Sequence, residues 1–231
     1  MTRYFSSVRV VFVAALALLP GCLCQGERED SGSLELGKTH LEPLEARELT
    51  LAADFALDAP VGVTGAAPVV IVLAAERASC GLPKAQKRSF VLCYFGADDE
   101  PEKEVRAALT VVKKTYAAYV AKPPVTLVGR GRFGRVALEW ARNEPTFFTD
   151  VLAEIPSSDL LPSSEFRAFA DRGGHRFALV AERGAEADRL LASTRSAPAA
   201  FRLFAPGARS VNEAFAWLVG PPGLDVTVPV P

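Results

Sequence analysis

A regular alternation of short apolar runs with amphipathic segments constrains the fold of this chain more than any other feature. The apolar runs are rich in β-branched residues, as expected of strands that are buried on both faces. We predict strands at residues 69–75, 90–96, 125–128, 146–155, 177–182 and 201–206, and helices at 98–120, from 131 onward, and at 164–172, 185–196 and 211–219. Repeated strand–helix–strand units predict an α/β fold with a mostly parallel, doubly wound sheet and helices on both faces.

Local signals at the ends of two segments support these helices. Acidic residues gather at the start of 98–120 and lysines follow late, an order that complements the helix dipole. The helix at 211–219 is preceded by a capping box, Ser210 to Glu213, in which Ser210 is the expected N-cap. Residues 34–60 are expected to add one or two edge strands, and 225–230 either a further strand or a tail.

The N-terminus has the pattern of an export signal. Arg3 and Arg9 precede an unbroken apolar run, Val10 to Leu19, which is too short to span a bilayer core of roughly 30 Å. The run ends in Leu19-Pro20-Gly21-Cys22, which resembles a bacterial lipobox. The resemblance implies cleavage before Cys22 and acylation of that residue. The alternatives are an ordinary cleaved signal, with Cys22 a bystander, or an uncleaved anchor.

We therefore predict a lipoprotein signal peptide at 1–21, a flexible tether at 22–42, and one α/β domain at 43–231. The lipobox resemblance implies a bacterial cell-envelope protein, and Leu23 after the lipidated cysteine favours the outer membrane over the inner. From Cys22 onward the chain has 24 basic and 27 acidic residues, a formal charge of −3. No basic stripe indicates nucleic acid as a partner. The expected partners are membrane lipid, through Cys22, and an envelope protein or small ligand.

The remaining cysteines leave one question open. Cys24 lies in the tether, whereas Cys80 and Cys93 could form a disulfide in an oxidising compartment. Alternatively, Cys93 is a small buried hydrophobe within an apolar strand. The chain has only two histidines and no clustered metal-ligand spacing, so we predict no metal site and no cofactor.

Residues 125–138, VTLVGRGRFGRVAL, contain the most informative motif. Gly129, Gly131 and Gly134 match the dinucleotide-binding pattern G-x-G-x-x-G, and Asp150 follows near the place of a ribose-binding acid. Two strong strands precede this motif, whereas the fingerprint normally follows the first strand. A lone G-x-G-x-x-G is therefore a weak indication of nucleotide binding.

The same element order resembles the middle of an α/β-hydrolase of the dienelactone-hydrolase or small-esterase kind, over roughly residues 45–220. In that family the turn reads G-x-S-x-G, and its serine sits on a sharp elbow between strand and helix. Gly129 matches the first glycine, Gly131 the serine, Phe133 the second glycine and Gly134 a further glycine. The resemblance thus implies a degenerate nucleophile elbow.

The other catalytic groups of that family are missing. Ala74 to Arg77 stand where the family often has His-Gly, and the loop 206–210 lacks the family's histidine. His40 lies near the tether and His175 precedes a strand. Only the acid has candidates, which are Glu182, Glu186 and Asp188. A Ser-His-Asp mechanism needs a nucleophile and a base within hydrogen-bond reach, and the sequence offers neither.

Two further groups of residues could take part in catalysis or in ligand binding. Ser79 and Cys80 lie in a loop on the ligand-binding side of the predicted sheet, but no activating base is evident nearby. Arg130 and Arg132, with Arg135 beside them, could hold a carboxylate or phosphate at the elbow. The preferred interpretation is that these arginines form ordinary surface salt bridges.

The sequence thus favours a lipid-anchored, exported binding or scaffold module with an α/β-hydrolase-like domain and no triad. The first alternative is an active serine esterase with an unusual or misaligned site. Such a misalignment would place a serine, and not Gly131, at the tip of the elbow. The second alternative is a nucleotide-binding domain that uses Gly129 to Gly134.

Overall fold

The structure is a computed structural model, and it describes residues 44, 51–82, 88–122, 124–156, 162–194 and 200–220. Contacts divide the chain into two units, Met1–Thr39 and His40–Pro231, and every described residue belongs to the second. The predicted signal peptide, the predicted tether at 22–42 with Cys22, Cys24 and His40, and the tail 225–230 lie outside the described residues.

The described part of the second unit is built on one seven-stranded sheet with the strand order β1-β3-β2-β4-β5-β6-β7. The strands are β1 (Phe55–Asp58), β2 (Val69–Leu73), β3 (Phe90–Tyr94), β4 (Val125–Gly129), β5 (Phe148–Glu154), β6 (Arg176–Val180) and β7 (Ala200–Phe204). Only β1 runs antiparallel to its neighbour, and all other pairings are parallel. The predicted mostly parallel sheet is confirmed, and β1 is an edge strand expected from residues 34–60.

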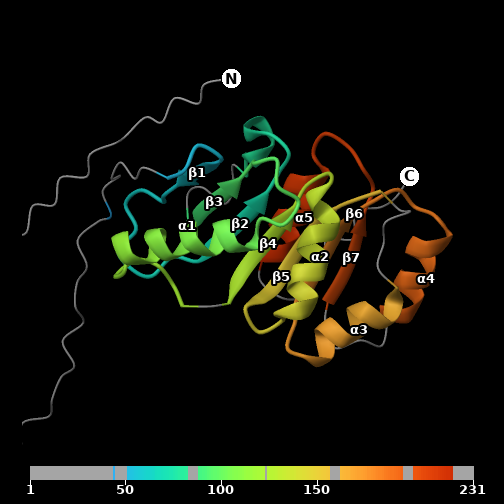
Figure 1. The fold of residues 1–231 in the computed structure, drawn as a ribbon. Helices are drawn as coiled ribbons and strands as arrows, with labels where there is room; N and C mark the ends of the chain where they lie inside the picture. Colours follow the sequence, from blue (N-terminus) through green and yellow to red (C-terminus); the bar gives the residue numbers. More distant parts are fainter. Residues whose placement is uncertain are drawn as a thin grey trace, which may run out of the picture. The chain divides into compact units, whose positions relative to one another are not determined.

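Helices cover both faces of the sheet, as predicted, but they are divided unequally (Figure 1). The helices are α1 (Glu102–Thr115), α2 (Phe133–Asn143), α3 (Ser163–Asp171), α4 (Ala185–Thr194) and α5 (Ser210–Val219), with a 3₁₀ turn η1 (Arg77–Cys80) after β2. Side chains of α1 to α4 pack into one apolar cluster, and α5 packs into the other. Alternate strand residues supply the two clusters, since successive side chains point to opposite faces.

The order of the strands brings the middle of the chain to the middle of the sheet. β4 lies fourth of seven and pairs with β2 on one side and β5 on the other. Every residue of β2 and β3 is buried, which explains their continuous apolar sequences. The loops that follow β2, β4, β5, β6 and β7 therefore gather at one edge, where the carboxyl ends of the parallel strands meet.

Two local predictions need correction. The first helix ends at Thr115 and not near residue 120, because Val120 leaves the helix to form an isolated parallel bridge with Ala67. Ser210 is the first residue of α5 and not its N-cap. The N-cap is Arg209, whose side chain forms no capping hydrogen bond. The Ser210 hydroxyl instead donates to the carbonyl oxygen of Ala205, 2.5 Å away. Among the described residues, no helix has the length and apolar character needed to cross a membrane.

Candidate functional site

A sharp turn joins β4 to α2, and we call residues 129–134 the elbow. β4 ends at Gly129, and α2 begins at Phe133, so only three residues reverse the direction of the chain. Gly131 lies at the tip of this turn with φ of +57°, a conformation that most side chains avoid. A side chain added to Gly131 would meet no atom within 4 Å. The tip of the elbow therefore faces open space and carries no side chain.

The other two glycines of the elbow serve packing. A Cβ on Gly129 would lie 2.3 Å from the carbonyl oxygen of Phe133. A Cβ on Gly134 would lie 2.1 Å from Cγ2 of Ile155 and 2.3 Å from the backbone oxygen of Glu154. Both positions therefore require glycine so that α2 can approach β4 and β5 closely. These contacts explain the G-x-G-x-x-G spacing without a bound nucleotide.

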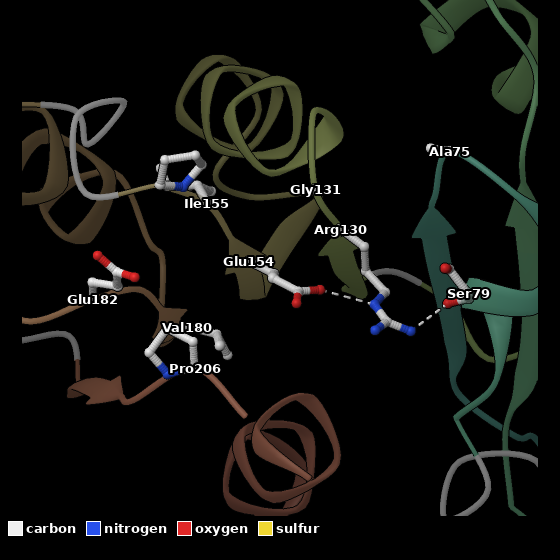
Figure 2. Close-up of a pocket in the computed structure, with 10 residues that line it drawn as sticks. Ala75, Ser79, Arg130, Gly131, Glu154, Ile155, Val180, Glu182 and Pro206 are labelled. Carbon is white, nitrogen blue, oxygen red and sulfur yellow. Dashed lines mark hydrogen bonds and ion pairs between the residues drawn. The ribbon is translucent and has the colours of Figure 1, made fainter. Parts of the chain in front are cut away.

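The elbow forms one side of an open crevice of about 630 Å³ at the carboxyl ends of the strands (Figure 2). We use "crevice" for the space lined by Ala75, Ser79, Arg130, Gly131, Glu154, Ile155, Pro156, Val180, Glu182 and Pro206. These residues follow or end five different strands. Ligands of open α/β sheets bind at this edge, where connections leave the strands in opposite directions.

Two of the elbow arginines are held in place by acceptors within the domain. Arg130 Nε donates to Glu154 Oε2 at 3.0 Å, and Arg130 Nη1 donates to the Ser79 carbonyl oxygen at 2.6 Å. Arg132 donates to the Gly96 carbonyl oxygen and forms an ion pair with Asp99. The geometry therefore matches ordinary salt bridges and gives no support to an anion site built from Arg130 and Arg132.

Arg135 is the third arginine near the elbow. It forms an i,i+4 ion pair with Glu139 on the exposed side of α2, at 2.8 Å. An exposed pair of this kind stabilises a helix only weakly.

The structure places Glu182 and Asp188, two of the acids that follow β6, in different surroundings. Glu182 lines the crevice and is exposed, whereas Asp188 pairs with Arg183 at 3.0 Å, away from the lining. The side chain of Glu186 lies outside the described part of the structure. Glu182 is thus the described acid from this group that reaches the site.

No histidine lies at the crevice among the described residues. His175 immediately precedes β6, and its backbone N–H donates to the Thr149 carbonyl oxygen. The crevice lies beyond the other end of β6, so at 3.3 Å per residue His175 is roughly 20 Å from it. The loop between β7 and α5, residues 205–209, contains no histidine.

The two nucleophile candidates outside the elbow have structural partners. Cys80 forms a disulfide with Cys93, so its sulfur carries no thiol in this state. The disulfide is one of the two possibilities that the sequence left open. The Ser79 hydroxyl lies 3.4 Å from a carboxylate oxygen of Glu76, and no imidazole accompanies it among the described residues. Neither group is paired with a histidine base among the described residues.

The conditions for nucleotide binding are only half met. β4 does lie at the centre of the sheet, below an open crevice. Asp150, however, lies in the first half of β5 and pairs with Arg176 at 3.1 Å, away from the carboxyl edge. A ribose-binding acid must stand at that edge. Within the described residues, no group of three or more His, Cys, Asp or Glu side chains could hold a metal ion.

Glu154 is the site residue that sequence reasoning missed. It is the last residue of β5 and is in register with Val180 of β6, while the preceding Ala153 is in register with Gly129 of the elbow. Glu154 therefore lies between the elbow and the end of β6. The sequence showed an acid near the end of a predicted strand, but its partner Arg130 lies 24 residues away. Their pairing depends on the neighbouring position of β4 and β5, which the sequence alone did not specify.

Comparisons with known proteins agree with this geometry at the level of the fold. No protein-family model matches the chain, and no curated protein matches it. Among solved structures, the chain is similar to FphF, a fluorophosphonate-binding serine hydrolase of Staphylococcus aureus, with a TM-score of 0.52 and 8% identity over 72% of this chain and 92% of that one.

Two further solved structures are similar at lower TM-scores. A thermostable esterase matches at 15% identity and a TM-score of 0.49, over 71% of this chain. This chain spans only 58% of the length of that esterase. An S-formylglutathione hydrolase from Agrobacterium tumefaciens matches at 14% identity and a TM-score of 0.44, over 65% of this chain and 80% of that one. The sheet order, the elbow and the FphF match together show that this chain has an α/β-hydrolase-like fold.

Proposed function

We propose that this chain is an exported, lipid-anchored protein whose α/β-hydrolase-like domain does not catalyse hydrolysis and binds a ligand or partner at the crevice. One observation carries the proposal: Gly131 occupies the tip of the elbow with φ of +57°. A serine there would present its hydroxyl to a substrate, whereas glycine has no atom that can attack a carbonyl. The esterase alternative with a misaligned site predicted a serine at this tip, whereas an unusual site elsewhere is left to the ester-turnover test below.

The lack of a base near the elbow supports the same proposal. Removal of a single member of a serine–histidine pair lowers kcat by about 10⁶ in a protease of this mechanism. Here both members are absent from the described part of the crevice, because His175 lies at the opposite ends of the strands. Glu182 alone has a position comparable to that of the triad acid, since it is the second residue after β6.

The proposed anchor rests on the sequence alone. The apolar run Val10 to Leu19 and the cysteine at position 22 have the order of a lipoprotein signal. Two or three acyl chains on Cys22 would hold the protein stably, since one chain gives only marginal binding. We propose the outer membrane as its place, with the domain connected to the membrane by the polar tether.

Ester turnover tests the non-catalytic domain. The full chain, purified in detergent, would be assayed with p-nitrophenyl acetate beside a heat-denatured sample and a Ser79→Ala variant. We expect no rate above the heat-denatured control. A rate that disappears on heating contradicts the proposal, and its loss in Ser79→Ala would identify the crevice hydroxyl as the nucleophile.

Metabolic labelling tests the anchor. Bacteria expressing the full chain would receive an alkyne-tagged palmitate, with Cys22→Ala and Cys24→Ala variants as a matched pair. The expected result is label on the parent and on Cys24→Ala, and none on Cys22→Ala. Label that persists in Cys22→Ala, or a parent without label, contradicts acylation at Cys22. Separation of inner and outer membranes then tests the proposed location.

A further inference from the structure

The two sides of the crevice differ in charge balance. On the elbow side, Arg130 and Glu154 neutralise each other through a 3.0 Å ion pair. Both described hydrogen bonds of the Arg130 guanidinium go to acceptors of the domain, Glu154 and the Ser79 carbonyl oxygen. A ligand anion would therefore have to compete with the Glu154 carboxylate for this guanidinium.

The opposite side carries the unbalanced charge. No hydrogen bond or ion pair joins Glu182 to another residue in the described ranges. The neighbouring Arg183 pairs with Asp188 and not with Glu182. In Figure 2 the Glu154 carboxylate is directed toward Arg130, so it leaves Glu182 as the separate negative charge of the lining. The charged lining residues Arg130, Glu154 and Glu182 thus sum to −1.

Apolar surface lies beside this carboxylate. Ile155, Val180 and Pro206 line the same crevice, and they come from the ends of β5, β6 and β7. A volume of about 630 Å³ is within the usual range of roughly 300 to 1,000 Å³ for small-molecule sites. Ile155 and Val180 are only 4% and 2% exposed, so the exposed Pro206 presents most of this apolar surface. The lining therefore offers one negative charge without a described partner next to a small apolar surface.

We propose that the crevice binds a small organic cation, an amine with an apolar body, whose ammonium group pairs with Glu182. This inference rests on the proposed function and specifies its ligand class. The ammonium donates to the Glu182 carboxylate, and the apolar body packs against Val180, Ile155 and Pro206. The cation thus stands where the imidazole of a triad would stand beside its acid, which gives the retained carboxylate a role without catalysis.

Three probes with one apolar body and different charge test the ligand class. Isothermal titration calorimetry of the full chain in detergent would compare phenethylamine, 2-phenylethanol and 3-phenylpropionate at millimolar concentration. We expect phenethylamine to bind most tightly and the anion most weakly. Equal affinity for all three, a preference for the anion, or no binding of phenethylamine overturns the inference.

A matched pair of variants tests the anchoring carboxylate. Glu182→Gln removes one negative charge at the crevice, and Asp171→Asn removes one at the end of α3, next to the opposite edge of the sheet. We expect Glu182→Gln to weaken phenethylamine binding about fivefold or more and Asp171→Asn to leave it unchanged. An unchanged Kd in Glu182→Gln overturns the inference. Ester turnover separately decides the proposed function, so the two can fail independently.

Discussion

The two sides of the crevice differ in how firmly their residues are held by the rest of the domain. On the elbow side, glycines, an ion pair and a disulfide-linked turn are all tied into the domain. Arg130 connects β4 to the end of β5 and to the turn η1, and Cys80 fixes that turn to β3. On the far side, Glu182 and Pro206 are exposed, and Glu182 has no described partner.

This difference shows that the glycines on either side of the elbow tip serve packing. Gly129 and Gly134 are required by contacts below 2.5 Å that any Cβ would make, whereas the tip at Gly131 is sterically open. The geometry of the elbow therefore does not depend on a side chain at its tip, because the glycines on either side of the tip are required for α2 to pack on β4 and β5. In the proposed function, the less constrained side of the crevice selects the ligand.

Gly134→Ala should give the largest effect and tests the packing role of the elbow side. Its Cβ would overlap the backbone oxygen of Glu154, which cannot move away without disturbing β5. We expect a loss of at least about 3 kcal/mol in the free energy of unfolding, measured by urea denaturation. A loss below about 1 kcal/mol would contradict close packing at this contact.

Removal of the disulfide should cause the second-largest loss of stability. Cys80→Ala combined with Cys93→Ala opens a loop with a sequence separation of 13 residues. Loss of this constraint on the unfolded chain should cost about 3 kcal/mol, and the parent in reducing agent should show a comparable loss. Equal unfolding midpoints for the parent with and without reducing agent would show that the bond does not form or does not stabilise.

Gly131→Ala is the matched control for Gly134→Ala, with a smaller expected effect. There is room for the added methyl, so the cost is only that of holding alanine at φ of +57°, about 1 kcal/mol. The same urea series measures it. If Gly131→Ala cost more than Gly134→Ala, packing would not distinguish the two positions and the comparison would fail.

Charge removal gives the smallest effects and compares the two sides directly. Arg130→Met leaves Glu154 and the Ser79 carbonyl oxygen without their partner, and partial exposure limits the cost to about 1 kcal/mol. Glu182→Gln removes no described contact and should stay within about 0.5 kcal/mol of the parent. A stability loss in Glu182→Gln as large as in Arg130→Met would show that Glu182 is structurally tied after all.

Much of the fold follows from local pattern, since buried parallel strands are continuous apolar runs such as Val69–Leu73 and Phe90–Tyr94. The position of Gly131 at a strand-to-helix turn followed from the same pattern. Helix ends were less predictable, because Val120 and Ser210 take contacts outside their helices, with Ala67 and Ala205.

The site was less predictable than the fold. The Cys80–Cys93 disulfide depends on the placement of β3 beside β2, and the Arg130–Glu154 pair depends on the register of β4 and β5. Both contacts depend on which strands are neighbours in the sheet, and a single sequence does not reveal that order. The lone carboxylate of Glu182 was visible in sequence only as one of three acids after a strand.

Active-site labelling tests the central claim most directly, which is the proposal that the domain has no activated serine nucleophile. The full chain would be incubated with a fluorophosphonate, digested and searched by mass spectrometry for a phosphonylated serine, with Gly131→Ser carried alongside. We predict no adduct on the parent. A stoichiometric adduct on any serine of the native parent, lost on heat denaturation, would contradict the claim and identify the serine that acts as the nucleophile.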